Sequence, residues 1–218
     1  METFQFGSTS SGLPILGHRL GRSGPEVLVI GGVHGNEPEG VVASFGLLQR
    51  FLPSYTLKVR LTIVPQFNLD GVLKLERRNA RGVDLNRNLP TKDWTANVKE
   101  EKYFPGQEPN SEPENRALVA WIDTVKPKFI MSLHSWKPCL NINGNCRQEA
   151  EVIKATTGYE IIEDIGYPTP GCLGTYCGLE RDIPTLTYEI ERGLDAPRVL
   201  KTHVPALHEA LKSVEKRF

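Results

Sequence analysis

The sequence predicts an α/β fold in which a mixed, largely parallel central β-sheet is flanked by helices. Short apolar runs rich in branched residues alternate with longer segments of helical periodicity along its 218 residues. Hydrophobic residues make up 39% of the chain and charged residues 24%, which is the balance of a globular protein. No repeat, low-complexity stretch or long linker interrupts the alternation, so we expect a single domain over residues 1–218.

The first half of the chain supplies two expected strands and one expected helix. Residues 27–30 form an apolar run that ends at Gly31-Gly32, which is typical of a buried strand followed by a sharp turn. Residues 38–51 have helical periodicity, and Pro38 lies in the first turn, where proline is tolerated. The face of this helix is expected to carry three apolar residues: Val41, Phe45 and Leu48. Residues 59–64 are the second strand-like run.

The second half of the chain supplies three expected helices and two expected strands. Ser111-Glu112-Pro113-Glu114 is a capping-box pattern, which predicts the start of a helix. The residues that this helix should turn inward are Leu118, Ile122 and Val125. The later elements are expected as strands at 129–133 and 184–190 and as helices at 148–157 and 200–214. Pro205 predicts a kink or a restart in the last helix, because proline removes a backbone hydrogen bond.

Composition argues against several classes of partner. Lys plus Arg and Asp plus Glu are 26 each, so bulk charge favours neither nucleic acid nor an anionic membrane. Residues 1–7 contain no basic segment followed by an apolar one, and no apolar run approaches the ~20 residues that span a bilayer. We therefore expect a cytoplasmic protein with no nucleic-acid or membrane partner. The cysteines lack Cys-x-x-Cys spacing, which predicts free thiols.

Three residues are candidate metal ligands. His34 and Glu37 follow the strand at 27–30, and His134 follows the apolar run at 129–133. Two imidazoles and one carboxylate leave the fourth tetrahedral position of zinc open for water, which is the arrangement of a catalytic site. The alternative for this short motif is a loop histidine beside a glutamate that the helix dipole favours.

Two irregular stretches, 82–109 and 166–182, are expected to be active-site loops, because ligands of parallel sheets bind at the carboxyl ends of the strands. The first contains Asp84, Asn86 and Arg87. An arginine can grip a carboxylate with two hydrogen bonds, and an aspartate can hold the second nitrogen of a metal-bound histidine. A polar surface loop is the alternative interpretation.

Taken together, these motifs resemble the zinc carboxypeptidase family in order and spacing. The resemblance extends from Gly31 to Gly193 and is carried by four segments: His34-x-x-Glu37, Arg77 to Asn88, His134-Ser135 and Tyr188-Glu189. Within the family the chain is most similar to bacterial murein peptide amidases, through Val83 to Asn88 with Trp94, Ser111 to Glu114, and Gly166-Tyr167-x-Thr169-Pro170-Gly171. The resemblance implies a three-layer sandwich with one zinc ion per chain. It also implies a small peptide substrate, cut at the γ-D-glutamyl–meso-diaminopimelate bond during cell-wall recycling.

The resemblance implies a catalytic role for five residues. His34, Glu37 and His134 match the zinc ligands of the family. Glu189 matches its general base and acid. Arg77 matches the arginine that polarises the scissile carbonyl and stabilises the oxyanion.

Four further residues match positions that bind the substrate or support the metal. Asn86 and Arg87 match the pair that binds the terminal carboxylate, so the bond that is cut adjoins the C-terminal residue. Asp84 matches the partner of the first zinc histidine. Tyr167 matches the mobile tyrosine that caps the substrate, although a half-buried tyrosine with a satisfied hydroxyl is an equal alternative.

The chain departs from the murein amidases in two places. Ser135-Trp136-Lys137 follows the second histidine where those enzymes have an acidic residue, and Leu89 replaces an aromatic residue. Lys137 is expected to be solvated rather than to meet a carboxylate of the substrate. Two rival functions stay open: a zinc acylase of the aspartoacylase or succinylglutamate desuccinylase type, and a non-catalytic module that binds murein peptides.

Overall fold

The apolar runs of the sequence form the buried strands at the centre of the protein. The computed structural model describes residues 1–218. Its central strands β3 (Glu26–Gly31), β4 (Arg60–Val64), β5 (Phe129–Trp136) and β8 (Thr185–Glu191) pair in parallel. Residues 27–30 have no exposed surface, as expected for a parallel strand that is covered on both faces. All four strands lie where the sequence predicts them, with ends that differ by a few residues.

Four strands that the sequence analysis does not include complete the sheet at its two edges. The strand order is β1-β2-β4-β3-β5-β8-β6-β7. The additional strands are β1 (Glu2–Ser8), β2 (Pro14–Leu20), β6 (Cys139–Asn143) and β7 (Glu160–Ile162). Four of the seven pairings are parallel and three are antiparallel, which confirms a mixed, largely parallel sheet.

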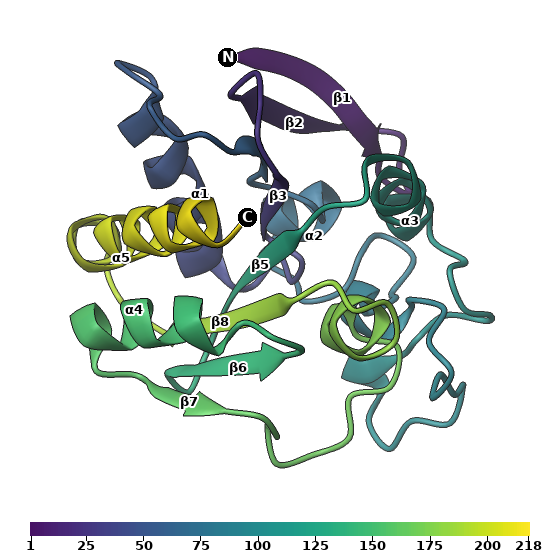
Figure 1. Ribbon diagram of the computed structural model, residues 1–218. Helices are drawn as coiled ribbons and strands as arrows, with labels where there is room; N and C mark the ends of the chain where they lie inside the picture. The colour runs from purple at the N-terminus through teal and green to yellow at the C-terminus, as the bar shows by residue number, and fades with distance from the viewer.

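Helices cover both faces of this sheet, which produces three layers (Figure 1). One face carries α1 (Pro38–Phe51), α4 (Arg147–Thr157) and α5 (Ala196–Arg217). The other face carries α3 (Pro113–Val125), whose Leu118 and Ile122 are buried as predicted. The connections contain shorter helices: α2 (Leu69–Lys74), η1 (Leu85–Arg87), η2 (Glu101–Tyr103) and η3 (Gly174–Leu179).

The buried face of α1 differs from the predicted one. Leu48 is buried as predicted, but Phe45 is 38% exposed, and Ala43, Leu47 and Phe51 are buried in addition. The reason is the row of small residues on this helix: a side chain at Gly40 would overlap the backbone of Leu133 in β5. Small residues let the helix lie close to the sheet, and a pattern of large apolar residues does not detect them.

The capping-box prediction for α3 is wrong in its details. The helix begins at Pro113, its N-cap is Glu112, and no side chain caps it. Ser111 instead donates a hydrogen bond to the Glu112 carboxylate, and the Glu114 carboxylate accepts one from the backbone N–H of Ser10. Tertiary hydrogen bonds therefore use the side chains that a local cap would need.

Pro205 does not divide the last helix, because α5 runs through it from Ala196 to Arg217. Val199 and Val204 before the proline, and Leu207 and Leu211 after it, are all buried. Burial of one continuous apolar face offsets the missing backbone hydrogen bond. None of the helices combines the length and the hydrophobicity that crossing a bilayer requires.

Candidate metal centre and substrate pocket

The three candidate metal ligands meet at the carboxyl ends of β3 and β5. The Nδ1 atom of His34 lies 3.0 Å from Oε1 of Glu37 and 3.2 Å from Nδ1 of His134. The Nδ1 atom of His134 lies 2.9 Å from Oε2 of Glu37. All three side chains are buried. The structure thus brings together ligands from two segments that are far apart in sequence.

The spacing and chemistry of these donors fit zinc. Zinc–nitrogen bonds of about 2.0–2.1 Å at a tetrahedral angle place two nitrogens roughly 3.3 Å apart, and the two Nδ1 atoms are 3.2 Å apart. The Nε2 atoms of both histidines have other partners, so both Nδ1 atoms face one point. Two nitrogen lone pairs held that close repel each other unless a metal ion or a proton lies between them.

The loop between β3 and α1 needs its glycines to place His34 and Glu37. Gly32 has a φ of +64°, a conformation that residues with a Cβ rarely adopt. A side chain at Gly35 would overlap the backbone of Gly71 in α2. The loop can therefore enter the site before His34, and pass close to α2 between the two ligands, only with glycine at these two positions.

Each histidine ligand is oriented by a hydrogen bond on its other nitrogen. Nε2 of His34 lies 3.0 Å from Oδ1 of Asp84, and Nε2 of His134 lies 3.0 Å from Oγ of Ser132. Burial acts to raise the pKa of Asp84, but His34 and Arg77 outweigh it and hold the pKa below its ordinary value. An ionised Asp84 accepts the Nε2 proton of His34 and leaves Nδ1 free for a metal.

Glu189 lies beside the ligand set because β5 and β8 pair in parallel, with His134 and Glu189 as direct partners in the register. Its carboxylate is 7% exposed, and Oε2 has no hydrogen-bond partner in the protein. Burial raises the pKa of Glu189 to about 7; His134 and Arg77 act against this rise and Glu37 reinforces it. A carboxylate with that pKa can accept and return a proton near neutral pH.

The polar residues of the 82–90 segment are held by hydrogen bonds within the protein rather than exposed at its surface. Arg77 forms two bonds to Asp84, from Nε at 2.9 Å and from Nη2 at 2.8 Å. Asn86 accepts a hydrogen bond from the backbone N–H of Leu173, and Arg87 donates one to the Asn86 carbonyl at 2.6 Å. The surface-loop alternative is therefore wrong, since Asp84 and Arg87 are buried.

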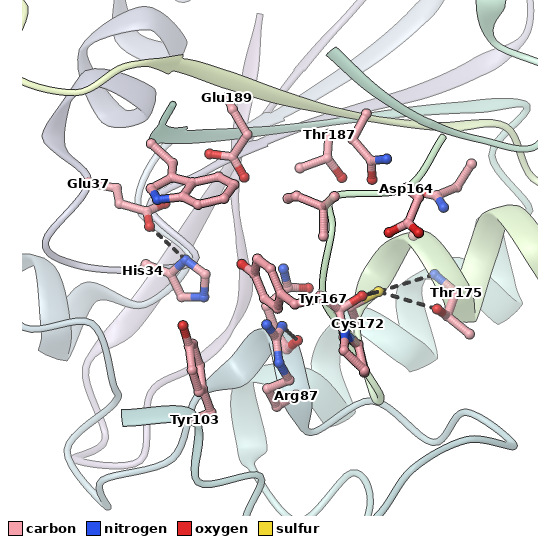
Figure 2. A pocket seen from close by; sticks show the side chains of 18 of the residues that line it. His34, Glu37, Arg87, Tyr103, Asp164, Tyr167, Cys172, Thr175, Thr187 and Glu189 are labelled. Carbon is pink, nitrogen blue, oxygen red and sulfur yellow. Dashed lines mark hydrogen bonds and ion pairs between the residues drawn. The ribbon is translucent and has the colours of Figure 1, made fainter. Parts of the chain in front are cut away.

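One cavity of about 420 Å³ contains the candidate residues that face the substrate. Figure 2 shows the side chains of Glu189, Tyr167 and Arg87 in this cavity, next to His34 and Glu37. Tyr167 is half-buried, and its ring lies 5.8 Å from the ring of Trp136. The predicted active-site loops line the cavity, through residues 86, 87, 102 and 103 of the first and 167–169, 172, 174, 175 and 179 of the second.

The sequence analysis misses other residues of this cavity. The ring of Tyr103 lies near two arginines, 5.2 Å from the Arg77 guanidinium and 5.3 Å from that of Arg87. Asp164 and Arg192 also line the cavity. A tyrosine in the 82–109 loop and an arginine three positions after Glu189 are weak sequence signals, since neither belongs to a motif.

The cysteines are free thiols, as predicted. Burial raises the pKa of Cys139 to about 12, and Glu189 adds to that rise, which disfavours the reactive thiolate form. Lys137 is exposed and lies 5.3 Å from the Trp136 ring, in agreement with the solvated interpretation.

Comparison with known proteins places this geometry in a family. The profile described as zinc carboxypeptidase matches residues 1–172. Murein peptide amidase A of Vibrio campbellii is 33% identical over an alignment of 203 positions that covers 83% of this chain and 79% of that protein. Murein peptide amidase A of Escherichia coli K12 is 30% identical over 161 residues; that match spans 69% of this chain and only 65% of the relative. The crystal structure of a murein-tripeptide amidase from Escherichia coli O157 superposes with a TM-score of 0.84 at 26% identity, over 97% of this chain and 92% of that one.

Proposed function

This chain belongs to the zinc carboxypeptidase family and is a zinc metallopeptidase, and from this premise we propose that it hydrolyses the γ-D-glutamyl–meso-diaminopimelate bond of murein peptides. The observation that carries the proposal is the shared cavity. A buried base, Glu189, and a candidate carboxylate clamp, Asn86 with Arg87, line it beside the zinc ligands. Such an arrangement suits cleavage of an amide next to a free carboxylate.

The rest of the cavity favours a substrate whose C-terminal residue has a polar side chain. Beyond the residues already described, its lining offers amides, hydroxyls and two carboxylates: Asn141, Asn143, Thr175, Thr187, Glu163 and Asp164. A diamino dicarboxylic acid has groups for all of these partners, whereas an aromatic or branched side chain would leave them without hydrogen bonds. Three relatives that are at least 30% identical over most of this chain carry the name murein peptide amidase.

In the proposed mechanism, each residue has one task. When bound, zinc supplies Lewis-acid chemistry and makes water acidic enough to react near neutral pH. Glu189 accepts the proton of the attacking water and delivers it to the leaving amine. Arg77 stabilises the charge that develops on the carbonyl oxygen. Asn86 and Arg87 hold the terminal carboxylate, Asp84 orients His34, and Tyr167 closes over the substrate.

The proposal extends to one catalytic domain over residues 1–218 acting in cell-wall recycling in the cytoplasm. A single sheet that takes strands from both ends of the chain supports the single domain. The acylase and the binding module are not favoured: the curated relatives are named murein peptide amidases or carboxypeptidases, and every catalytic position holds a competent residue.

Mass spectrometry of purified murein tripeptide and tetrapeptide after digestion tests the proposal. We expect free diaminopimelate from the tripeptide. Release of the terminal residue from the tetrapeptide alone would replace the amidase with a carboxypeptidase. Turnover of N-acetylaspartate or N-succinylglutamate with both murein peptides intact would favour the acylase, and binding of the tripeptide without cleavage would favour the binding module.

A further inference from the structure

Arg192 directly follows β8 and contacts both segments that carry the metal ligands. Its Nη1 donates a hydrogen bond to the Asn36 carbonyl at 3.2 Å. Its Nε and Nη2 donate to the Ser135 carbonyl at 3.2 Å and 2.9 Å. Asn36 adjoins the ligand Glu37, and Ser135 adjoins the ligand His134. One guanidinium group therefore spans the two chain segments at the point where each carries a ligand.

The same group also contacts a ligand directly. Nη2 of Arg192 lies 3.3 Å from Oε1 of Glu37. The Glu37 carboxylate is thereby held on one side by Arg192, and on the other by the backbone N–H of Ser135, which donates to Oε2 at 3.2 Å. Both oxygens of this ligand have fixed partners before any metal arrives.

A second acidic residue anchors the segment from which Arg192 projects. Glu39, which is 4% exposed, accepts a hydrogen bond from the backbone N–H of Gly193 at 2.6 Å and another from Oγ of Ser135 at 2.5 Å. The backbone N–H of Arg192 donates to the Trp136 carbonyl at 3.1 Å. The base of the arginine is therefore fixed on both sides, and its side chain starts from a defined position.

We propose that Arg192 is a positioning residue of the metal centre, which sets the separation of the Glu37 and His134 segments. The planar, multidentate guanidinium suits this task, because its N–H groups point in fixed directions and reach two carbonyls at once. Residues that orient metal ligands typically contribute 10-fold to 100-fold to metal affinity. The inference concerns zinc binding only and does not depend on the identity of the substrate.

The positive charge of Arg192 opposes zinc binding, whereas its hydrogen bonds to the ligand segments favour it. A cation near the site disfavours a dication, but the side chain of Arg192 is 44% exposed, so solvent weakens this repulsion. The two effects can be separated. Arg192→Gln removes both the charge and the bridge, whereas Arg192→Lys keeps the charge but replaces the three separate nitrogens of the planar guanidinium with a single nitrogen.

The test measures zinc affinity by competition with a chelator, together with the absorption spectrum of the cobalt-substituted protein. We expect the dissociation constant to rise about 10-fold to 100-fold in Arg192→Gln, and at least as much in Arg192→Lys. The cobalt spectrum should change in both variants, because the ligand geometry relaxes. Arg198→Gln is the matched control, since Arg198 is exposed and pairs only with Asp195, the N-cap of α5, and it should bind zinc like the wild type.

Wild-type affinity in Arg192→Gln, or full rescue by Arg192→Lys, would overturn the proposal. An equal loss in Arg198→Gln would also overturn it, because the effect would then be unspecific. A midpoint temperature of thermal unfolding equal to that of the wild type, measured on the metal-free variants, would show that the fold is intact. If the variants lose zinc as expected but the wild type does not cleave murein peptides, the proposed function fails and this inference stands.

Discussion

Replacement of Glu189 by glutamine tests the proposed general base without changing the zinc ligands. Glutamine has nearly the same size as the 7% exposed glutamate, and the zinc ligands are unchanged, so zinc content should stay near one per chain. Glutamine cannot accept the proton of water. Loss of a general base costs about 10²-fold to 10⁴-fold in kcat, which corresponds to roughly 3–5 kcal/mol of activation free energy.

The same substitution should alter the stability of the metal-free protein in a way that depends on pH. The pKa of Glu189 is about 7 in the folded protein and about 4.3–4.5 in an unfolded chain. A pKa that folding raises stabilises the folded state at low pH, and this stabilisation is lost as the pH rises through the folded value. A difference of about 2.5 pKa units corresponds to roughly 3 kcal/mol at most. Metal-free Glu189→Gln should therefore be more stable than the wild type at pH 8 by up to about 3 kcal/mol, and by less than about 1 kcal/mol at pH 5.

Two assays check these expectations. Turnover of murein tripeptide with zinc bound measures kcat, and denaturant titration after chelation at pH 5 and pH 8 measures the free energy of unfolding. Glu191→Gln is the matched control, because Glu191 is exposed two positions further along the same strand. A kcat for Glu189→Gln within threefold of the wild type would refute the base assignment. Equal stabilities at pH 8 would refute the claim that burial opposes the ionised carboxylate.

Three other substitutions test the supporting residues. Asp84→Asn should weaken zinc binding about 10-fold to 100-fold, because an amide cannot fix the His34 tautomer as a carboxylate does; unchanged affinity in chelator competition would argue against this role. Arg87→Ala should raise KM for substrates with a free terminal carboxylate far more than for their amidated analogues, and equal kinetic effects on both would remove it from the anion site. Burial lowers the pKa of His203 to about 4, below about 6.5 in an unfolded chain. As the pH falls, His203 is therefore protonated in the unfolded state before it is protonated in the folded state. The free energy of unfolding should fall by up to about 3 kcal/mol as the pH drops from about 6.5 to 4. His203→Gln should flatten this loss in denaturant titrations, and an identical pH dependence in the variant would contradict the reasoning.

The sequence predicts the central strands well because of where they lie. A parallel strand that is buried on both faces must be apolar along its length, so β3 and β5 leave a continuous signal. The strand β1 has one half-exposed face, and β7 has three residues. Neither shows a pattern that distinguishes a short edge strand from a loop. Their places depend on pairing partners that are distant in sequence.

The candidate site divides in the same way. Zinc ligands and their partner Asp84 belong to motifs whose order along the chain resembles a family. Tyr103 and Arg192 belong to no motif, and they reach the site through contacts that only the folded chain creates. Arg192 acts through the backbone carbonyls of two other residues. Because every residue has a carbonyl, the residue types of those partners give no signal in the sequence.

The register between β5 and β8 connects the buried core to the chemistry. Along β8, Thr187 and Glu189 line the cavity, whereas Leu186, Tyr188 and Ile190 belong to the core beneath α5. Because side chains alternate between the faces of a strand, a shift by one residue would bury Glu189 in that core and expose Tyr188 to the cavity. The hydroxyl of Tyr188 is hydrogen-bonded to His203 of α5, which adds a specific contact to the burial of Tyr188. A residue on the far face of the sheet thus helps to keep the proposed base beside the metal, so substitutions at His203 should affect catalysis as well as stability.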